Sequence, residues 1–253
     1  MLTTLSHGHA EVITAQFLYR IRQIGFGDHV SSDVLIDRTC AEVSGTLMTA
    51  LLALKHGLAV NCAGGTHHAF HSYGKGYCIM NDLAITSKYL IDSGYCSRVL
   101  ILDLDVHQGD GTAKILENRP DIFTCSFHAA KNFPAKKEQS DLDIPLEDGC
   151  RDDEYLRILS ETLPKLLRQF KPSIVLYDAG VDVHKDDALG RLKITDDGLC
   201  RRENLVLDTV LGGFEIPIAG YVGGGYDDDL ATLAKRHLHL FSAASDAWSH
   251  HCS

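Results

Sequence analysis

The sequence predicts an α/β fold in which helices flank both faces of a parallel sheet. From Val60 onward, short apolar or β-branched runs alternate with longer amphipathic segments, an alternation typical of βαβ units. Some of these short runs, such as the one from Val99 to Leu102, are apolar throughout, as in strands buried on both faces. The chain has 253 residues, 45% of them hydrophobic, and no linker-like stretch, so we expect one domain over residues 1–253.

The expected elements follow each other along the chain. Before residue 41 we expect one helix, at residues 11–24, ended by the glycine-rich stretch 25–28, and we find no convincing strand. Apolar runs predict strands at residues 58–62, 99–104, 122–127, 174–177 and 216–219. Amphipathic segments predict helices at residues 41–55, 81–92, 112–117, 152–169, 195–211 and 228–243. Each strand runs into a loop rich in Gly, His or Asp, and ligands bind outside the carboxyl ends of parallel strands, so these loops should meet at one crevice.

The composition excludes some classes of function. The formal net charge is −10 and the chain has no basic cluster, which disfavours binding to nucleic acid through its phosphates. An acidic surface suits a cationic partner, such as a lysine-rich tail. No apolar run reaches the roughly 18 residues that a membrane-spanning helix needs.

The cysteines indicate the compartment. The chain has 8 cysteines and no Cys-x-x-Cys pair, and several lie in apolar strand or helix contexts, so we expect buried free thiols. The N-terminus also lacks the apolar segment of a signal peptide. Both observations predict a reducing, intracellular location.

The loop after the predicted strand at 99–104 has the residues of a cation site. Asp103 and Asp105 project to the same side of an extended chain, and His107 follows them if the chain stays extended. Buried carboxylates are costly unless they are paired or bind a metal, so this pattern favours a divalent cation. The alternative is an ordinary loop whose acids cap the next helix, as Asp110 could for a helix that begins near Thr112.

Two other loops could join this site. The adjacent His67 and His68 follow a glycine pair, which suits acid–base chemistry; the alternative is surface histidines in a flexible turn. Asp182 follows the strand at 174–177 and would complete a set of two carboxylates and one imidazole, which leaves an open position as a catalytic zinc site requires. The neighbours of Asp182 that could serve instead, or simply form a solvated rim, are His184, Asp186 and Asp187.

The last strand is followed by three glycines and Tyr226. The glycines would let the tyrosine reach a ligand, although this signal is weak alone. A phosphate loop is the competing interpretation. No Gly-Lys-Ser/Thr follows, and the acids at 227–229 would repel a phosphate.

Taken together, these motifs resemble the zinc-dependent histone deacetylase family. In order, they are Gly-Gly-Thr-His67-His68-Ala, Gly76-Tyr77-Cys-Ile-Met-Asn81-Asp82, Asp103-Leu-Asp105-Val-His107-Gln-Gly-Asp110-Gly, Asn132-Phe133-Pro, Asp178-Ala-Gly-Val-Asp182 and Gly-Gly-Gly-Tyr226. The resemblance is clearest over residues 58–239 and is greatest to class IV and bacterial members. It implies the arginase/deacetylase α/β fold. Because the family normally begins with a further strand and helices, we expect that N-terminal part of the domain to be missing here, with reduced or absent activity as a possible consequence.

The resemblance also implies roles for individual residues. Zinc would be held by Asp105, His107 and Asp182. The catalytic group would comprise His67 paired with Asp103, His68 paired with Asp110, and Tyr226. The walls of a narrow channel for the acyl-lysine would be Gly76, Tyr77 and Phe133. A structural potassium site would use Asp103, Asp105, His107, Ser126 and Phe127.

The implied activity is zinc-dependent hydrolysis of the acetamide of acetyl-lysine to acetate and free lysine. The implied partners are acetylated proteins such as histone tails, with roles in chromatin and transcription regulation, and no direct contact with nucleic acid or membrane. The location would be nuclear or cytoplasmic in a eukaryote and cytoplasmic in a bacterium. One zinc per chain and a potassium ion are the implied cofactors.

Two other hypotheses remain open at this point. The substrate could be an acetylpolyamine or another small acylated amine, because such substrates are also cationic. A truncated chain could instead be an inactive interaction module. A two-manganese ureohydrolase is disfavoured because it needs Asp-x-His-x-Asp, whereas this chain has Asp-x-Asp-x-His at 103–107.

Overall fold

The computed structural model describes residues 24–26 and 31–251, and it contains one sheet of 6 parallel strands. The strand order is β1-β6-β5-β2-β3-β4. The strands are β1 (Leu58–Asn61), β2 (Val99–Asp103), β3 (Ile122–Ala129), β4 (Leu142–Leu146), β5 (Ile174–Asp178) and β6 (Ile218–Tyr221). The predicted α/β fold class with a parallel sheet is therefore confirmed.

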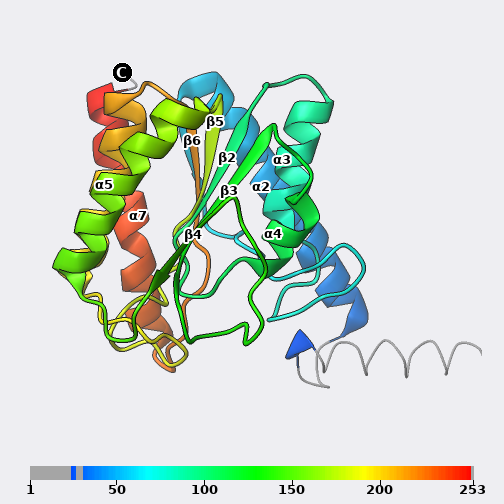
Figure 1. Ribbon diagram of the computed structural model, residues 1–253. Coiled ribbons are helices and arrows are strands. Elements are labelled where there is room, and N and C mark those ends of the chain that lie inside the picture. Colours follow the sequence, from blue (N-terminus) through cyan, green and yellow to red (C-terminus); the bar gives the residue numbers. More distant parts are fainter. Residues whose placement is uncertain (1–23, 27–30, 252–253) are drawn as a thin grey trace, which may run out of the picture.

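Helices cover both faces of the sheet, as Figure 1 shows. One face carries α2 (Ser32–His56), α3 (Asp82–Asp92) and α4 (Asp110–Leu116). The other carries α5 (Asp152–Phe170), α6 (Asp196–Leu207), the π-helical turn η1 (Asp208–Gly213) and α7 (Leu230–His251). The side chains of β2 divide between these two layers because a strand alternates its side chains. Leu100 and Leu102 pack with α5, α6 and α7, whereas Val99 and Ile101 pack with α2 and α3.

The strand that the sequence did not predict is β4. Its run Leu142-Asp143-Ile144-Pro145-Leu146 mixes polar and apolar residues, and it contains a proline. Proline cannot donate to the hydrogen-bond ladder, so such a run reads as a loop unless it lies at a sheet edge. The strand does lie at an edge, where β3 is its one neighbour in the sheet.

Several element boundaries differ from the predicted ones. The helix expected to begin at residue 41 begins at Ser32, and the last helix continues to His251 instead of ending at 243. The helix expected over 195–211 ends as α6 at Leu207, and the chain continues as η1. Of the helix expected at residues 11–24, all but Ile24 lie outside the described residues.

The prediction that the cysteines are buried free thiols is partly wrong. Cys78, Cys125 and Cys150 are buried, but Cys40 and Cys62 are exposed. The seven cysteines within the described part of the chain are all free thiols. No helix over residues 24–26 and 31–251 is long and apolar enough to cross a membrane.

Candidate active site

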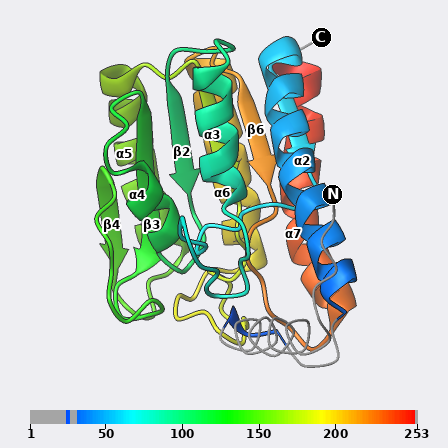
Figure 2. The ribbon, with the colours of Figure 1, turned by 90° about the vertical axis from the view of Figure 1, so that its right-hand side faces the viewer.

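The loops that follow β1, β2, β5 and β6 meet at one end of the sheet, at the bottom of the view in Figure 2. Backbone hydrogen bonds continue past the strand ends and hold these loops in register. The Leu104 amide donates to the Asp178 carbonyl at 3.0 Å, and the Ala179 amide donates to the Tyr221 carbonyl at 2.9 Å. Beyond them, the Val181 amide donates to the Gly224 carbonyl at 2.7 Å. The sheet thus positions the ends of three neighbouring strands as one unit.

Asp105, His107 and Asp182 form one buried cluster, although Asp182 comes from a different strand. The Nδ1 atom of His107 lies 3.0 Å from Asp105 Oδ1 and 3.1 Å from Asp182 Oδ2. Their exposed fractions are 1% for Asp105, 6% for His107 and 0% for Asp182. The structure therefore brings together the three residues that the resemblance implied as zinc ligands.

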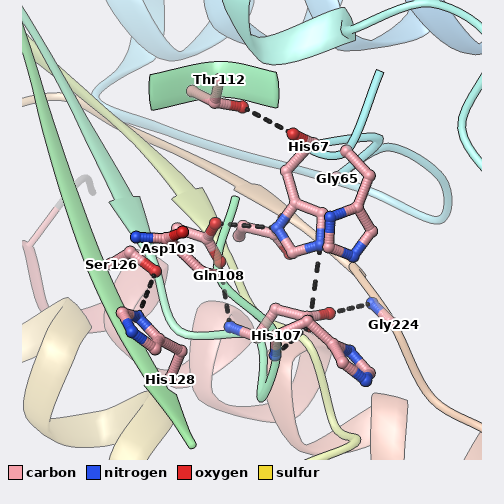
Figure 3. Close-up of polar contacts among 12 residues, drawn as sticks. Gly65, His67, Asp103, His107, Gln108, Thr112, Ser126, His128 and Gly224 are labelled. Carbon is pink, nitrogen blue, oxygen red and sulfur yellow. Dashed lines mark hydrogen bonds and ion pairs between the residues drawn. The ribbon is translucent and has the colours of Figure 1, made fainter. Parts of the chain in front are cut away.

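Backbone amides orient the two carboxylates of this cluster. The Gly224 amide donates to Asp105 Oδ2 at 2.9 Å, and the Val106 amide donates to Asp182 Oδ1 at 2.8 Å. A Cβ atom at Gly224 would lie 2.4 Å from an oxygen of each carboxylate, so the position requires glycine. The contact between Gly224 and the cluster is visible in Figure 3. The triple glycine therefore shapes the cluster as well as leading to Tyr226.

The cluster has a strong electrostatic preference for added positive charge. Burial opposes a proton on His107, but its hydrogen bonds with Asp105 and Asp182 raise the pKa of His107 to about 10. Burial and the charge of Asp105 raise the pKa of Asp182 to about 7. Two carboxylates and one imidazole with converging atoms are a donor set that zinc accepts. The residues present therefore fit a divalent cation.

The adjacent imidazoles His67 and His68 are each held by a different carboxylate. His67 Nδ1 lies 2.8 Å from Asp103 Oδ2, and His68 Nδ1 lies 2.7 Å from Asp110 Oδ1. Both rings are buried, with their centroids 4.1 Å apart, so they are not surface histidines in a flexible turn. Figure 3 shows the His67 ring directed at Asp103. The carboxylate of Asp110 points into the site and makes no capping bond at the start of α4.

The two imidazoles differ in their affinity for a proton. Burial disfavours a charge on His67, but Asp103, Asp105 and Asp178 outweigh this effect and hold the pKa of His67 well above its usual range. Burial and the nearby charge of His67 lower the pKa of His68 to about 3. One ring is therefore cationic and its neighbour neutral near pH 7.

Lys75 contacts the same carboxylate as His68. Its ammonium pairs with Asp110 Oδ2, the oxygen opposite the one that faces His68. Burial would raise the pKa of Asp110, but hydrogen bonds from His68 and Lys75 lower it. The ammonium also lies 5.1 Å from the centre of the Phe133 ring. The result is a continuous chain of contacts from Lys75 through Asp110 to His68.

A pocket of about 520 Å³ is lined by His68 of the imidazole pair and by His107 of the Asp105, His107 and Asp182 cluster. Its walls include the three residues expected to line a substrate channel, Gly76, Tyr77 and Phe133. The Phe133 ring stands edge-on to His68, with centroids 4.8 Å apart. The complete lining consists of Ile24, Gly25, His68, Lys75, Gly76, Tyr77, His107, Asn132, Phe133, Leu189 and Tyr226.

Tyr226 lies across the pocket from the imidazoles. Its ring centre is 6.4 Å from that of His107 and 6.0 Å from that of Tyr77. Burial and the charges of Asp105 and Asp182 raise the pKa of the phenol, so it remains a neutral hydrogen-bond donor. Its backbone amide donates to Asp187 Oδ2 at 2.7 Å.

The loop that carries His67 and His68 is anchored by the first residues of α3. Asp82 accepts hydrogen bonds from the Gly65 amide, the Thr66 amide and hydroxyl, and the Thr46 hydroxyl, at 2.6 to 3.1 Å. Asn81 donates to the His67 carbonyl at 3.1 Å while its side-chain oxygen caps α3 through the Ala84 amide. Both residues stood in a motif of the sequence, but no role could be given to them there.

Arg202 supports the loop that carries Asp182. Its guanidinium is fully buried and donates to the carbonyls of Gly180 at 2.7 Å and Ala179 at 3.1 Å. Its charge is balanced by Glu203, whose carboxylate lies 2.6 Å away. No local pattern in the sequence signals this role, because the partners are carbonyls from a distant strand end.

The rim residues after Asp182 have separate surroundings. Asp186 is largely exposed, as a solvated rim predicts, but His184 is buried. Asp187 accepts hydrogen bonds from the amides of Leu189, Gly190 and Tyr226, so it organises the loop instead of facing solvent. None of the three joins the cation cluster.

The residues proposed for a potassium site lie on two neighbouring strands, β2 and β3, and on the loop after β2. Asp103 pairs in register with Ser126, and Phe127 follows Ser126 on β3. The Ser126 hydroxyl lies 3.1 Å from His128 Nδ1, as Figure 3 shows. Asp105 and His107 follow Asp103 on the loop beyond β2.

Fold and site together define an α/β protein in which a buried group that could hold a cation, made of two carboxylates and an imidazole, lies near a pair of adjacent imidazoles at the carboxyl ends of a parallel sheet. The sequence profile of the histone deacetylase domain matches residues 5–241. The chain belongs to the histone deacetylase family.

Individual relatives give the same result. The chain is 52% identical to an uncharacterized protein of Picosynechococcus over 214 aligned residues. The aligned region covers 85% of this chain and 71% of the relative. It is 34% identical to histone deacetylase 2 of Arabidopsis thaliana, over 73% of this chain and 48% of the relative. It is 32% identical to histone deacetylase RPD3 of Saccharomyces cerevisiae, over 74% of this chain and 45% of the relative. The chain thus matches about half the length of these two histone deacetylases.

Proposed function

We propose that this protein is a zinc-dependent deacetylase that hydrolyses the acetamide of acetyl-lysine in proteins. The observation that carries the proposal is that the Asp105, His107 and Asp182 cluster adjoins the His67–His68 pair, and that His107 and His68 line the same pocket. An amide carbonyl that enters this pocket would meet a cation site, a proton acceptor and the Tyr226 phenol together. Family membership supports the same class of reaction.

Asp105, His107 and Asp182 would hold the zinc ion. When bound, zinc supplies polarisation of the substrate carbonyl and of a water molecule. The remaining chemistry belongs to the protein. The Nδ1 proton of His68 is directed at Asp110, which leaves Nε2 free to accept a proton.

His68 is the general base in this proposal. Its low pKa keeps it neutral, so Nε2 takes a proton from the attacking water and returns it to the departing lysine amine. The C–N bond of the amide breaks, and water supplies its oxygen to the acetate and both of its protons to the amine. His68 delivers one of these protons and ionisation of the product acid gives the other, so the products are acetate and the lysine ammonium. His67, cationic beside Asp103, stabilises the negative charge that develops in the pocket. The Tyr226 phenol donates a hydrogen bond to the oxyanion, a contact worth on the order of 3 kcal/mol.

The pocket walls suit a long aliphatic side chain. Tyr77 and Phe133 present aromatic faces, which pack well against methylenes. We further propose histone tails among the substrates, with a role in chromatin and transcription regulation, no direct contact with nucleic acid, and an intracellular location. A potassium ion at Asp103, Asp105, His107, Ser126 and Phe127 is a second proposed cofactor.

The test is hydrolysis of an acetyl-lysine peptide by the zinc-loaded full chain. Tyr226→Phe removes one hydroxyl and should lower kcat about 100-fold, and His68→Ala should lower it 100-fold or more. Zinc content should stay at the wild-type level in both variants. Tyr95→Phe and His239→Ala, which change the same residue types away from the pocket, should retain wild-type rates.

The same assay separates the alternative substrates. Acetylspermidine and a long-chain acyl-lysine peptide are compared with the acetyl-lysine peptide. Preference for acetylspermidine would replace the protein substrate with a small acylated amine. Wild-type rates in His68→Ala or Tyr226→Phe would contradict the roles given to those residues, and a zinc-loaded chain that hydrolyses none of these substrates would contradict the proposed enzyme.

A further inference from the structure

Asp178 is a buried carboxylate to which the proposed reaction gives no task. It ends β5 with an exposed fraction of 0%, and neither of its oxygens has a hydrogen-bond partner in the described structure. A buried charge without a partner is costly, so native carboxylates are paired, protonated or bound to a cation. The surroundings of Asp178 therefore decide which of these compensations applies.

Two potential metal ligands lie beside Asp178. Its Oδ2 atom is 3.8 Å from His67 Nδ1, which in turn is 2.8 Å from Asp103 Oδ2. One ligand atom from each of the three residues lies within 4.8 Å of the others, and all three residues are buried. The residues are different from those of the Asp105, His107 and Asp182 cluster, so the two groups share no ligand.

Two glycines allow the backbone to approach this carboxylate closely. A Cβ atom at Gly65 would lie 2.8 Å from both Asp178 oxygens, and one at Gly223 would lie 2.0 Å from Oδ1. Both glycines have φ values in the left-handed region, at +85° and +62°. The two loops thus approach the carboxylate closely with backbone alone and place no hydrogen-bond donor on it.

The charge balance at this point favours a cation. Asp103, Asp105 and Asp178 all surround the single His67 ring, whose Nε2 atom lies 3.7 Å from Asp105 Oδ1. One imidazolium would leave a net negative charge among three carboxylates. A divalent ion would neutralise Asp103 and Asp178 together.

We propose that His67, Asp103 and Asp178 form a second cation site beside the Asp105, His107 and Asp182 cluster. An imidazole nitrogen with two carboxylates suits a divalent first-row transition ion such as Zn²⁺, Mn²⁺ or Co²⁺ better than Mg²⁺, Ca²⁺ or K⁺, which prefer oxygen ligands throughout. His67 Nδ1 can bind this cation or donate to Asp103, but not both. The site goes beyond the proposed function, which leaves Asp178 unused and describes the chain with one zinc ion and with His67 protonated; a filled second site would replace the His67 proton and would compete with potassium for Asp103.

The experiment measures the Co²⁺ content of the full chain after metal removal, reloading and gel filtration. Wild type should hold two equivalents. Asp178→Asn, which keeps the size of the side chain, should hold one, and so should Asp182→Asn, which disables the other cluster. The matched control is Asp121→Asn, a carboxylate-to-amide change at the start of β3 and away from the site, which should hold two. Circular dichroism checks that each variant is folded.

The visible absorption of bound Co²⁺ gives a second readout that does not depend on activity. The two sites differ in ligands, so the spectra of Asp178→Asn and Asp182→Asn should differ, and their sum should reproduce the wild-type spectrum. One equivalent in wild type, or an unchanged content in Asp178→Asn, would overturn the proposal. Either result would mean that a proton, and not a metal ion, compensates Asp178.

Discussion

His67 and His68 are neighbours in sequence with opposite protonation preferences: burial and the charge of His67 lower the pKa of His68, whereas nearby carboxylates raise that of His67. His67 faces Asp103, Asp105 and Asp178, whereas the closest carboxylate of His68 is that of Asp110, which it shares with Lys75. Lys75 neutralises part of the negative charge that would otherwise favour a proton on His68. A single lysine on the pocket wall thus helps to keep the proposed base neutral.

Replacing Lys75 with methionine tests this contribution. Lys75→Met keeps the aliphatic stem but removes the charge-assisted hydrogen bond to Asp110, so kcat/KM should fall about tenfold for a loss of about 1.4 kcal/mol. Metal content should not change, because Lys75 contacts no residue of the cation cluster. Lys75→Arg should restore most of the rate. Loss of metal from Lys75→Met would show instead that the effect is structural.

The residues missed by the sequence share one property. Lys75, Asp178 and Arg202 act through partners 35, 111 and 22 positions away, at Asp110, His67 and Gly180. Strand periodicity reports the face on which a side chain lies, but it does not report which distant group lies opposite. Asp105 and His107 could be predicted because the alternation within one strand end already places them together.

At the scale of elements, α7 packs against the glycine-rich loop through His237. A Cβ atom at Gly225 would lie 3.0 Å from His237 Nε2, and the buried Nδ1 of His237 has no hydrogen-bond partner in the described residues. Burial, together with the charges of Arg202 and Arg236, lowers the pKa of His237 to about 4. The interface between α7 and the loop therefore requires a neutral ring.

This interface should weaken in acid. The unfolded chain binds a proton at His237 near pH 6.5, whereas the folded chain resists it down to about pH 4. The neutral His237 ring therefore costs the folded chain no stability above pH 6.5, and the free energy of unfolding decreases as pH falls from 6.5 toward 4. Between pH 7 and pH 5, His237 should account for about 1 to 2 kcal/mol of the loss in free energy of unfolding. This loss is measured by urea unfolding of wild type and His237→Gln at pH 7 and pH 5. An equal change in the free energy of unfolding in the two proteins would contradict the prediction.

Elements with a continuous apolar run could be predicted, and the others could not. β2 and β5 are buried on both faces, so their sequences carry the signal without interruption. β4 is held by its pairing with β3 at a sheet edge. Because Pro145 interrupts its apolar pattern, local sequence patterns do not predict a strand there. The early start of α2 at Ser32 was missed because its exposed residues Val34 and Ile36 break the amphipathic pattern.

For the whole molecule, the cation cluster links binding to stability. Asp105 and Asp182 come from loops after β2 and β5, so an ion held between them joins two strand ends. When the free ion is present at about 1,000 times its Kd, its binding adds about 4 kcal/mol to the free energy of unfolding. In a chain of this size, that raises Tm by roughly 10 °C. The ion would therefore act as a cross-link in the native state.

Chelation gives the corresponding measurement. Dialysis against EDTA should lower the Tm of wild type by roughly 10 °C, and added Zn²⁺ should restore the original Tm. Asp105→Asn should begin with a lower Tm under zinc and should lose less of it to EDTA than wild type does. Asp121→Asn should respond as wild type does. A wild-type Tm that does not change with EDTA or Zn²⁺ would show that the cluster binds no ion with useful affinity.

The order of the parallel strands explains why fold and site could be predicted together. Every strand of a parallel sheet ends on the same side, so acidic and histidine-rich loops at separate places in the sequence had to meet. The sequence could not specify how closely they meet. That depends on contacts such as the Gly224 amide on Asp105, which form between chain segments far apart in sequence.

The attachment of the His67 loop to Asp82 has a mechanical consequence. Asp82 accepts hydrogen bonds from the backbone amides just before the two imidazoles. The side-chain amide of Asn81 donates a hydrogen bond to the carbonyl of His67 itself. The backbone that carries both rings is therefore attached to the amino end of α3, although that helix supplies no reacting atom. The Thr112 amide of α4 also donates to the His67 carbonyl, at 3.0 Å, and the rings themselves contact Asp103 and Asp110. The alignment of the proton acceptor with Asp105 and Asp182 thus depends on how two helices, α3 and α4, are seated on one face of the sheet.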